Sequence, residues 1–203
     1  MIDPVRFLSN LSTGEMGYAL ARAAVSKGYQ ASLVSGPTQL QPPKGVKFYG
    51  VTSAVQMKRT CEAFFPKHDA LVMTAAVCDF MPVSSERHKI SSAMGLTLKL
   101  KRTPDILATL AKRKGKRVVI GFCLETRDLI RRATGKLVRK KLDGIVANFY
   151  GSGRIPFGKR RVKVHLIDGA GNVRILADRS KTQIAKTLLH WMEGLKEASQ
   201  SAS

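Results

Sequence analysis

A short polar loop near the start of the chain carries the side chains that are best suited to binding or catalysis. It contains Asn10, Ser12 and Thr13. Gly14 and Gly17 follow, and an amphipathic segment with helical spacing begins there. We expect Ser12 or Thr13 to cap this helix. Small residues at a helix start leave backbone N–H groups exposed at the positive end of the helix dipole, where anions bind. The loop predicts an anion site beside an amide; an ordinary capped helix is the alternative.

Two single charged residues add to this chemistry. Asp79 follows an apolar run, and a carboxylate accepts hydrogen bonds from the amino group of cytosine or adenine. Lys89 lies in a long connection rich in serine, where a flexible ammonium group could meet a transient phosphate charge. The alternatives are an aspartate that caps a turn and a solvated loop lysine.

A basic helix supplies a possible polyphosphate site. Lys136 and Lys140 are four residues apart in the run Lys136–Asp143, so they share one face of the helix. Two ammonium groups on one face repel each other unless an anion lies between them, and a triphosphate would suit this position. A solvated basic face is the alternative.

The overall charge also indicates an anionic partner. Lysine and arginine number 35 against 14 acidic residues, for a formal net charge of +21. Such a balance favours nucleic acid, an anionic surface or a polyphosphate substrate. The basic residues are spread along the chain, and aromatic residues make up only 6% of it. Nucleic acid is therefore the less favoured partner, since no aromatic residues are interleaved with the basic ones to stack on bases.

Length and composition predict one globular domain. The 203 residues suffice for a single domain, which we assign to residues 1–197, with a frayed tail at 198–203. No apolar run approaches the roughly 18 residues of a membrane span, and the N-terminus does not read as a signal peptide, so we expect a cytoplasmic protein. The three cysteines show no metal-binding spacing, and no metal ligand is assigned.

Elements of alternating type must position these side chains. We predict helices at 13–28, 53–65, 104–113 and 126–142, with a last one through Ile184 and Leu195. We predict strands at 30–35, 46–51, 70–77, 96–101, 117–123, 144–147, 162–167 and 173–177, with an irregular connection at 78–95. The apolar run 70–77 predicts a strand buried on both faces. This order predicts an α/β, Rossmann-like, doubly wound and mostly parallel sheet that ends in an antiparallel hairpin.

The carboxyl ends of the predicted strands should lie on one rim, where ligands bind in such sheets. The residues that follow strands 70–77, 96–101 and 117–123 would meet there. These are Cys78 and Asp79, then Arg102 and Thr103, then Leu124 and Glu125.

Several motifs, taken in order, resemble phosphopantothenoylcysteine synthetase, the ligase half of the bacterial bifunctional coenzyme A biosynthesis flavoprotein. The resemblance covers roughly residues 2–190. The motifs are Asp3–Asn10, Ala75–Asp79, His88–Ile90, Thr103–Leu107, Gly121–Thr126, Lys136–Asp143 and Ala147–Asn148.

The resemblance implies a reaction and its partners. The family joins 4′-phosphopantothenate to L-cysteine at the expense of CTP in most bacteria, with ATP as the alternative nucleotide. The pantothenate carboxylate attacks the α-phosphate, and the cysteine amine then displaces the nucleotide from the acyl-nucleotidylate. Mg²⁺ would accompany the nucleotide, no flavin is expected in this chain, and the family implies a homodimer.

The resemblance also implies roles for single residues. Asn10 would hold the acyl intermediate, and Lys89, on a mobile flap, would stabilise charge during turnover. The loop residues Ser12, Thr13 and Gly14 would bind substrate phosphate. Nucleotide binding would fall to Ala75, Asp79, Lys89, Lys101, Arg102, Thr103, Pro104, Phe122, Lys136 and Lys140, with Asp79 and the backbones of Ala75 and Phe122 at the base.

The chain also departs from the family pattern. The family's first strand and part of its phosphate cradle have no counterpart before Ile2, and Glu15 stands where the family usually has lysine. Further departures are Cys78, Ser91, Ser92, Leu124 and the loop 151–161. Two alternatives to a ligase therefore stay open: a non-catalytic relative that binds nucleotide, and a basic protein associated with nucleic acid.

Overall fold

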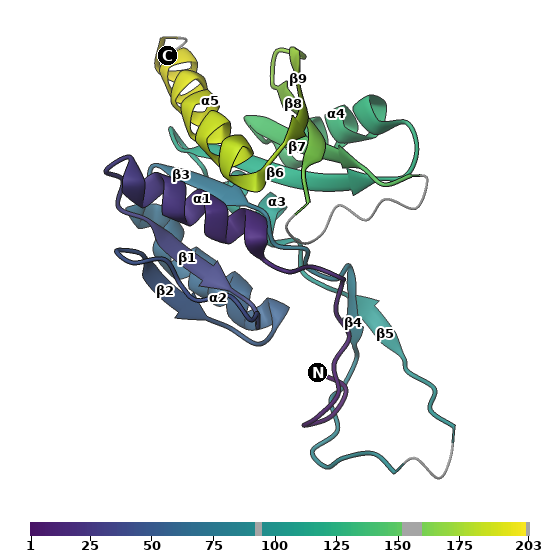
Figure 1. Cartoon of the computed structure of the whole chain (residues 1–203). Helices are drawn as coiled ribbons and strands as arrows, with labels where there is room; N and C mark the ends of the chain where they lie inside the picture. The colour runs from purple at the N-terminus through teal and green to yellow at the C-terminus, as the bar shows by residue number, and fades with distance from the viewer. Residues whose placement is uncertain (92–94, 152–159, 202–203) are drawn as a thin grey trace.

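A five-stranded sheet with the strand order β3-β6-β7-β8-β9 forms the centre of the molecule (Figure 1). The structure is a computed structural model that describes residues 1–91, 95–151 and 160–201. Strands β3, β6 and β7 are parallel, and β8 and β9 continue the sheet in antiparallel fashion. Their bounds are Ala70–Met73, Val118–Glu125, Gly144–Phe149, Val162–Asp168 and Val173–Arg179. The predicted α/β fold with a mostly parallel sheet and a terminal hairpin is confirmed.

A separate parallel pair lies beside this sheet. It consists of β1 (Ser32–Ser35) and β2 (Lys47–Gly50). Within the described residues β1 is hydrogen-bonded only to β2, and β3 only to β6, so no strand joins the two sheets. One edge of β3 therefore has no strand partner among the described residues.

The prediction that β3 is buried on both faces is wrong, and the edge of β3 that has no strand partner explains why. The apolar run 70–77 predicted a strand buried on both faces, but β3 ends at Met73 and all four of its residues are only half-buried. In the next strand Val118, Val119 and Ile120 are at most 1% exposed. Because β3 has a strand neighbour on one side only, its side chains keep part of their solvent exposure.

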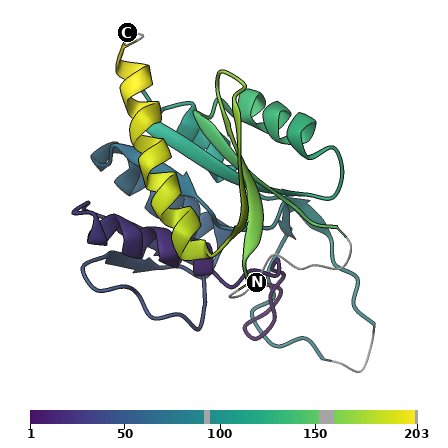
Figure 2. The same ribbon diagram turned by 45° about the horizontal axis from the view of Figure 1, so that its top comes forward.

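Helices cover both faces of the sheet. On one face lie α1 (Glu15–Ser26) and α5 (Lys181–Ser201), and on the other α2 (Ala54–Phe64), α3 (Ile106–Ala111) and α4 (Leu129–Lys140). Figure 2 shows α5 crossing the sheet beside the β8–β9 hairpin. Helix α5 continues to Ser201, past residue 197, where we placed the end of the domain. No helix among the described residues is long and apolar enough to cross a membrane.

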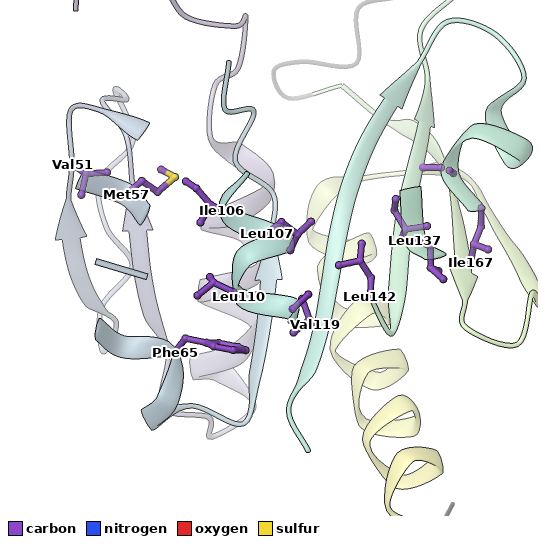
Figure 3. Close-up of a cluster of buried hydrophobic side chains, with 14 residues drawn as sticks. Val51, Met57, Phe65, Ile106, Leu107, Leu110, Val119, Leu137, Leu142 and Ile167 are labelled. Atoms are coloured by element: carbon purple, nitrogen blue, oxygen red, sulfur yellow. The ribbon is translucent and has the colours of Figure 1, made fainter. Parts of the chain in front are cut away.

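Alternation along the strands divides the core between these two layers. In β6, Val118 and Ile120 face α1 and α5, while Val119 faces α3 and α4. The hydrophobic cluster that contains α3 also includes residues of α2 and of the segments next to it, as Figure 3 shows. Its labelled members are Val51, Met57, Phe65, Ile106, Leu107, Leu110, Val119, Leu137, Leu142 and Ile167. Helix α3 therefore joins the β1–β2 unit to the five-stranded sheet through apolar contacts.

A two-stranded arm extends away from the body, with the N-terminal segment beside it (Figure 1). It consists of β4 (Phe80–Pro82) paired antiparallel with β5 (Leu100–Arg102). The predicted irregular connection 78–95 thus contains a strand, and the strand expected at 96–101 begins only at Leu100. Ser92 and most of the loop 151–161, both noted as departures from the family, lie outside the described residues.

Candidate active site

A cavity of about 1260 Å³ lies at the carboxyl ends of β3 and β6. The start of α1, the base of the arm and the basic face of α4 surround it. Many residues assigned to the site from sequence line this cavity: Asn10, Ser12, Thr13, Gly14, Ala75, Asp79, Arg102, Thr103, Pro104, Phe122, Lys136 and Lys140. Segments from distant parts of the chain therefore meet where the rim rule expected them.

Asn10 joins the N-terminal loop to the segment that follows β3. Its Nδ2 donates to the carbonyl oxygen of Ala76 at 3.1 Å, and its Oδ1 lies 3.4 Å from Sγ of Cys78. The amide is exposed, and it forms part of the cavity wall. These contacts fix the orientation of the amide, with one donor hydrogen of Nδ2 left for a ligand.

Gly14, and not Ser12 or Thr13, is the N-cap of α1, so the predicted capping is wrong. Gly14 adopts a left-handed conformation with φ 76°, and no side chain caps the first turn. The nearest candidate, the hydroxyl of Ser12, lies 3.5 Å from the backbone nitrogen of Gly14. The N–H groups of the first helical turn therefore have no side-chain acceptor, as an anion site requires.

Glu15 places a negative charge at this helix start, and Lys181 balances it. Nζ of Lys181, at the beginning of α5, lies 3.1 Å from Oε2 of Glu15, and both side chains are largely buried. Lys181 also lines the cavity. The cation from α5 thus offsets the repulsion that the Glu15 substitution would otherwise impose on a phosphate.

The cations of α4 are held by carboxylates from neighbouring elements. Nζ of Lys136 lies 2.6 Å from Oε1 of Glu125, and Nε of Arg132 lies 2.5 Å from Oε2 of the same carboxylate. Nζ of Lys140 lies 2.8 Å from Oδ2 of Asp105. Glu125 is 4% exposed. Burial alone would raise the pKa of the Glu125 carboxyl, but hydrogen bonds from Lys136 and Arg132 outweigh it and lower the pKa overall.

Sequence reasoning missed two further cations of this face. Arg132 and Arg139 line the cavity together with Lys136 and Lys140. Their spacing was the available signal, since residues 132, 136, 139 and 140 share one face of a helix. The cavity therefore faces four cations of α4 where the sequence analysis counted two.

The base of the arm positions the candidate base reader. The carbonyl oxygen of Asp79 accepts from the backbone N–H of Thr103 at 2.9 Å, and Arg102 pairs with Phe80 in the strand register. The Asp79 carboxylate is exposed beside Arg102 and Thr103 on the cavity wall. The pairing of β4 with β5 therefore brings together Asp79 and Arg102, which follow two different predicted strands.

Two of the predicted residues lie outside the cavity lining. Lys101 belongs to β5, opposite Met81, and Lys89 lies farther along the arm in an exposed stretch. Neither contributes to the cavity wall. A role for either would depend on where the arm stands relative to a bound substrate.

The described residues contain no group of three histidine, cysteine or acidic side chains that could hold a metal ion. Of the three carboxylates on the cavity wall, Glu15 and Asp105 are paired with cations, and the third is that of Asp79.

Comparisons with known proteins show what this chain is similar to. The chain is 40% identical over 198 residues to the coenzyme A biosynthesis bifunctional protein CoaBC of Bacillus subtilis, covering 97% of this chain and 49% of that protein. It is 38% identical over 191 residues to a cysteine/cysteine sulfinic acid decarboxylase of an unknown prokaryotic organism, covering 93% of this chain and 53% of that protein. The chain thus spans about half the length of the curated relatives it matches.

A solved structure extends the likeness to the fold. The crystal structure of the C-terminal domain of a coenzyme A biosynthesis bifunctional protein CoaBC matches with a TM-score of 0.82 at 36% identity, covering 97% of this chain and 90% of that one. A family model described as the DNA/pantothenate metabolism flavoprotein C-terminal domain matches residues 1–195. The chain belongs to the family of DNA/pantothenate metabolism flavoprotein C-terminal domains.

Proposed function

We propose that this chain is a nucleotide-dependent ligase that joins 4′-phosphopantothenate to L-cysteine in coenzyme A biosynthesis. The observation that carries the proposal is the cavity itself. It combines an uncapped helix start, an exposed carboxylate at Asp79 and a face of four cations on α4. The likeness to the solved C-terminal domain of a coenzyme A biosynthesis protein adds support, since it covers 97% of this chain and 90% of that domain.

Nucleotide binding would use the arm base and α4. Asp79 would accept from the amino group of the base, and Lys136 and Lys140 would hold the triphosphate with help from Arg132 and Arg139. CTP is the proposed nucleotide, with ATP as the alternative, because both bases offer an amino group to Asp79. Mg²⁺ bound to the phosphates would neutralise part of their charge.

The first step would form an acyl-nucleotidylate. A carboxylate oxygen of phosphopantothenate attacks the α-phosphorus, the bond to the β-phosphate oxygen breaks, and pyrophosphate leaves. The cationic face of α4 suits this step, because it stabilises charge on the departing pyrophosphate. The uncapped start of α1, with Ser12, Thr13 and Gly14, would bind the phosphate of phosphopantothenate.

The second step would form the amide bond. The cysteine amine attacks the acyl carbon, the bond to the nucleotide oxygen breaks, and the nucleoside monophosphate leaves as the nitrogen loses a proton to solvent. Asn10 would donate from Nδ2 to the acyl oxygen, since its contacts with Ala76 and Cys78 fix the amide in place. Lys89 would supply a positive charge from the arm during turnover.

We also propose that the chain works as a homodimer. Large apolar side chains lie exposed on the arm and on the N-terminal segment beside it, among them Phe7, Phe80, Val83, Leu98 and Leu100. Phe7 is 62% exposed and Phe80 is 50% exposed. Such a patch is typical of an interface, and a second copy of the chain is the partner that the family implies. Analytical ultracentrifugation at micromolar concentrations would measure the mass of the protein in solution and so distinguish a monomer from a dimer.

Pyrophosphate release tests the ligase proposal. The assay combines the chain with phosphopantothenate, L-cysteine, Mg²⁺ and either CTP or ATP, and each substrate is omitted in turn. Release that requires both phosphopantothenate and nucleotide, with amide product only when cysteine is present, supports the ligase. Nucleotide binding without release would indicate a non-catalytic relative. Retention of nucleic acid with a steep salt dependence would indicate the basic binding protein instead.

A further inference from the structure

Two segments far apart in the chain meet at one buried carboxylate, that of Asp3. Its Oδ1 accepts from the backbone N–H groups of Val5 at 2.9 Å and Arg6 at 2.8 Å. Its Oδ2 accepts from Nε of Arg6 at 2.8 Å and from the backbone N–H of Ile90 at 3.2 Å. The carboxylate thus ties the loop that leads to Asn10 to the part of the arm that carries Lys89.

Arg6 adds a second contact to the backbone of Ile90, at its carbonyl oxygen. Its guanidinium group is paired with Asp3 and also donates to the carbonyl oxygen of Ile90. Both backbone polar groups of Ile90 are therefore held by the N-terminal loop. Since neighbouring Cα atoms are about 3.8 Å apart, a fixed Ile90 backbone also restricts the Cα position of Lys89.

Packing alone does not restrain this part of the arm. Residues 83–89 are all exposed, so Lys89 has no buried neighbour in sequence to hold it before Ile90. Asp3, in contrast, is 0% exposed. A buried charge is costly unless it is fully hydrogen-bonded, and the donors from both segments satisfy this one. The restraint on this part of the arm is therefore polar. Asp3 and Arg6 hold the backbone of Ile90, and the backbone N–H of Glu86 donates to the carbonyl oxygen of Ile2 at 2.9 Å. Of these contacts, those to Ile90 lie next to Lys89.

The ionised state of Asp3 persists at neutral pH. Burial alone would raise the pKa of this carboxyl, but hydrogen bonds from the backbone N–H groups of Val5, Ile90 and Arg6 outweigh it and lower the pKa overall. The acceptor that holds Ile90 is thus present under conditions in which an enzyme of this kind would work.

We propose that Asp3 is a positioning residue that sets Lys89 relative to Asn10. This inference rests on the proposed ligase function, in which both residues act on the same acyl-nucleotidylate. Asp3 touches no substrate itself. A loss of the link would leave Lys89 misplaced and lower kcat, while the nucleotide KM would stay unchanged because Asp79 and α4 bind the nucleotide elsewhere.

The variant Asp3→Asn removes the contacts that Oδ2 accepts, from Nε of Arg6 and from the backbone N–H of Ile90. The asparagine carbonyl oxygen still accepts from Val5 and Arg6, so the local turn is kept. Its amide nitrogen would replace Oδ2 and cannot accept from the backbone N–H of Ile90. Glu86→Gln is the matched control, because it removes the same charge from an exposed residue of the same arm.

Two measurements test the proposal. The first is amide hydrogen exchange at Ile90 by NMR, which needs no activity. In the unmodified chain Ile90 exchanges more slowly than Lys89, and in Asp3→Asn its exchange is at least tenfold faster. The second is a double-mutant cycle of kcat with Lys89→Gln. Asp3→Asn lowers kcat at least tenfold, the nucleotide KM is unchanged, and adding Asp3→Asn to Lys89→Gln causes no further loss.

The contrary results are equally distinct. An Ile90 amide that is unprotected in the unmodified chain, or equally protected in Asp3→Asn, overturns the link. Additive losses of kcat in the cycle show that Asp3 does not act through Lys89. If the unmodified chain has no ligase activity, the proposed function fails, and the exchange rate at Ile90 then decides the proposed link by itself.

Discussion

Nζ of Lys136 lies 2.6 Å from Oε1 of Glu125, a carboxylate at the end of β6 that is 4% exposed. The pair holds the ammonium group on the wall of the cavity before any ligand arrives. A cation whose position is already fixed loses little side-chain freedom on binding, so more of its interaction with a phosphate contributes to affinity. In the proposed function Glu125 would therefore prepare the phosphate side of the cavity without itself contacting a phosphate.

We predict that Lys136→Met weakens nucleotide binding. A charge-assisted hydrogen bond contributes about 1.5–3 kcal/mol, which corresponds to a rise in the nucleotide dissociation constant of roughly 10- to 100-fold. Isothermal titration with CTP and Mg²⁺ measures the change. Lys141→Met is the control, since this exposed lysine at the end of the same helix does not line the cavity. Equal dissociation constants for the two variants would contradict the assignment.

We predict that Asn10→Asp lowers the rate of ligation by about 100-fold or more, in the range observed when a donor to a developing oxyanion is removed. The new carboxylate oxygen would face the carbonyl oxygen of Ala76, where Nδ2 now donates at 3.1 Å, and would repel an anionic intermediate. Amide product is measured by mass spectrometry, and circular dichroism checks the fold. Gln41→Glu makes the same chemical change at an exposed residue outside the cavity and should keep the full rate.

We predict that Asp79→Asn weakens CTP binding about tenfold and relaxes the choice of base. Asparagine can turn its amide to offer either a donor or an acceptor, so the preference for an amino group on the base is lost. Pyrophosphate release with CTP, ATP and UTP gives the three values of kcat/KM. An unchanged ratio between CTP and UTP would exclude Asp79 as the residue that reads the base.

Local patterns predicted the elements of the fold well, because each depends on short-range periodicity. Strand β6 is a case, since the strand predicted at 117–123 is found at Val118–Glu125. The prediction of burial on both faces failed for β3, whose exposure depends on whether another strand pairs with its free edge. Whether such a neighbouring strand is present depends on the whole sheet. No pattern within residues 70–77 could therefore indicate that β3 has a strand partner on only one side among the described residues.

Much of the cavity lining was predictable from the sequence, although Arg132 and Arg139 were missed, but the ion pairs of the cavity were not predictable. Asp105 and Lys140 are 35 residues apart and meet only because α3 and α4 lie on the same face of the sheet. The prediction for the capping of α1 failed for a local reason, since Gly14, with its left-handed backbone, is the N-cap, one residue beyond Thr13. Asp3 lies in a quoted family motif, yet nothing in the sequence indicates that its partner is Ile90.

We predict that the stability contributed by Glu193 depends on pH. This carboxylate on α5 is paired with Lys27 and Tyr29 at the end of α1, and hydrogen bonds from these two residues lower its pKa from 4.5 to about 2. A lowered pKa in the folded state stabilises the protein above the unfolded value, and the contribution is lost as the pH falls toward about 2. Glu193→Gln should therefore unfold at lower urea concentration than the unmodified chain at pH 7.

The urea midpoints of the two proteins should differ by a constant amount from pH 7 to about pH 5 and converge below about pH 4.5. Glu86→Gln, an exposed acid on the arm, should show no difference at any pH. A difference between Glu193→Gln and the unmodified chain that persists unchanged at pH 3 would show that the pair with Lys27 does not carry the effect.

We predict that Gly144→Ala destabilises the fold through Trp191. A Cβ atom at Gly144, in β7, would lie 2.4 Å from the Trp191 ring, which packs against the sheet from α5. The ring must move, and overpacking of this kind costs about 1–3 kcal/mol of unfolding free energy. Trp191 is the one tryptophan of the sequence, so its fluorescence reports directly on this contact. We expect a red-shifted emission together with a lower urea midpoint.

Gly194→Ala provides the matched control for this change. It adds the same methyl group to α5, where no atom other than those of its chain neighbours and of the surrounding helix backbone lies within 4 Å of the new Cβ among the described residues. Alanine favours a helix over glycine by roughly 0.5–1 kcal/mol, so this variant should be slightly more stable and keep the emission of the unmodified chain. If both variants gained stability, the close approach of β7 to α5 at Trp191 would be wrong, and with it the packing that places α5 across the sheet and Lys181 beside Glu15.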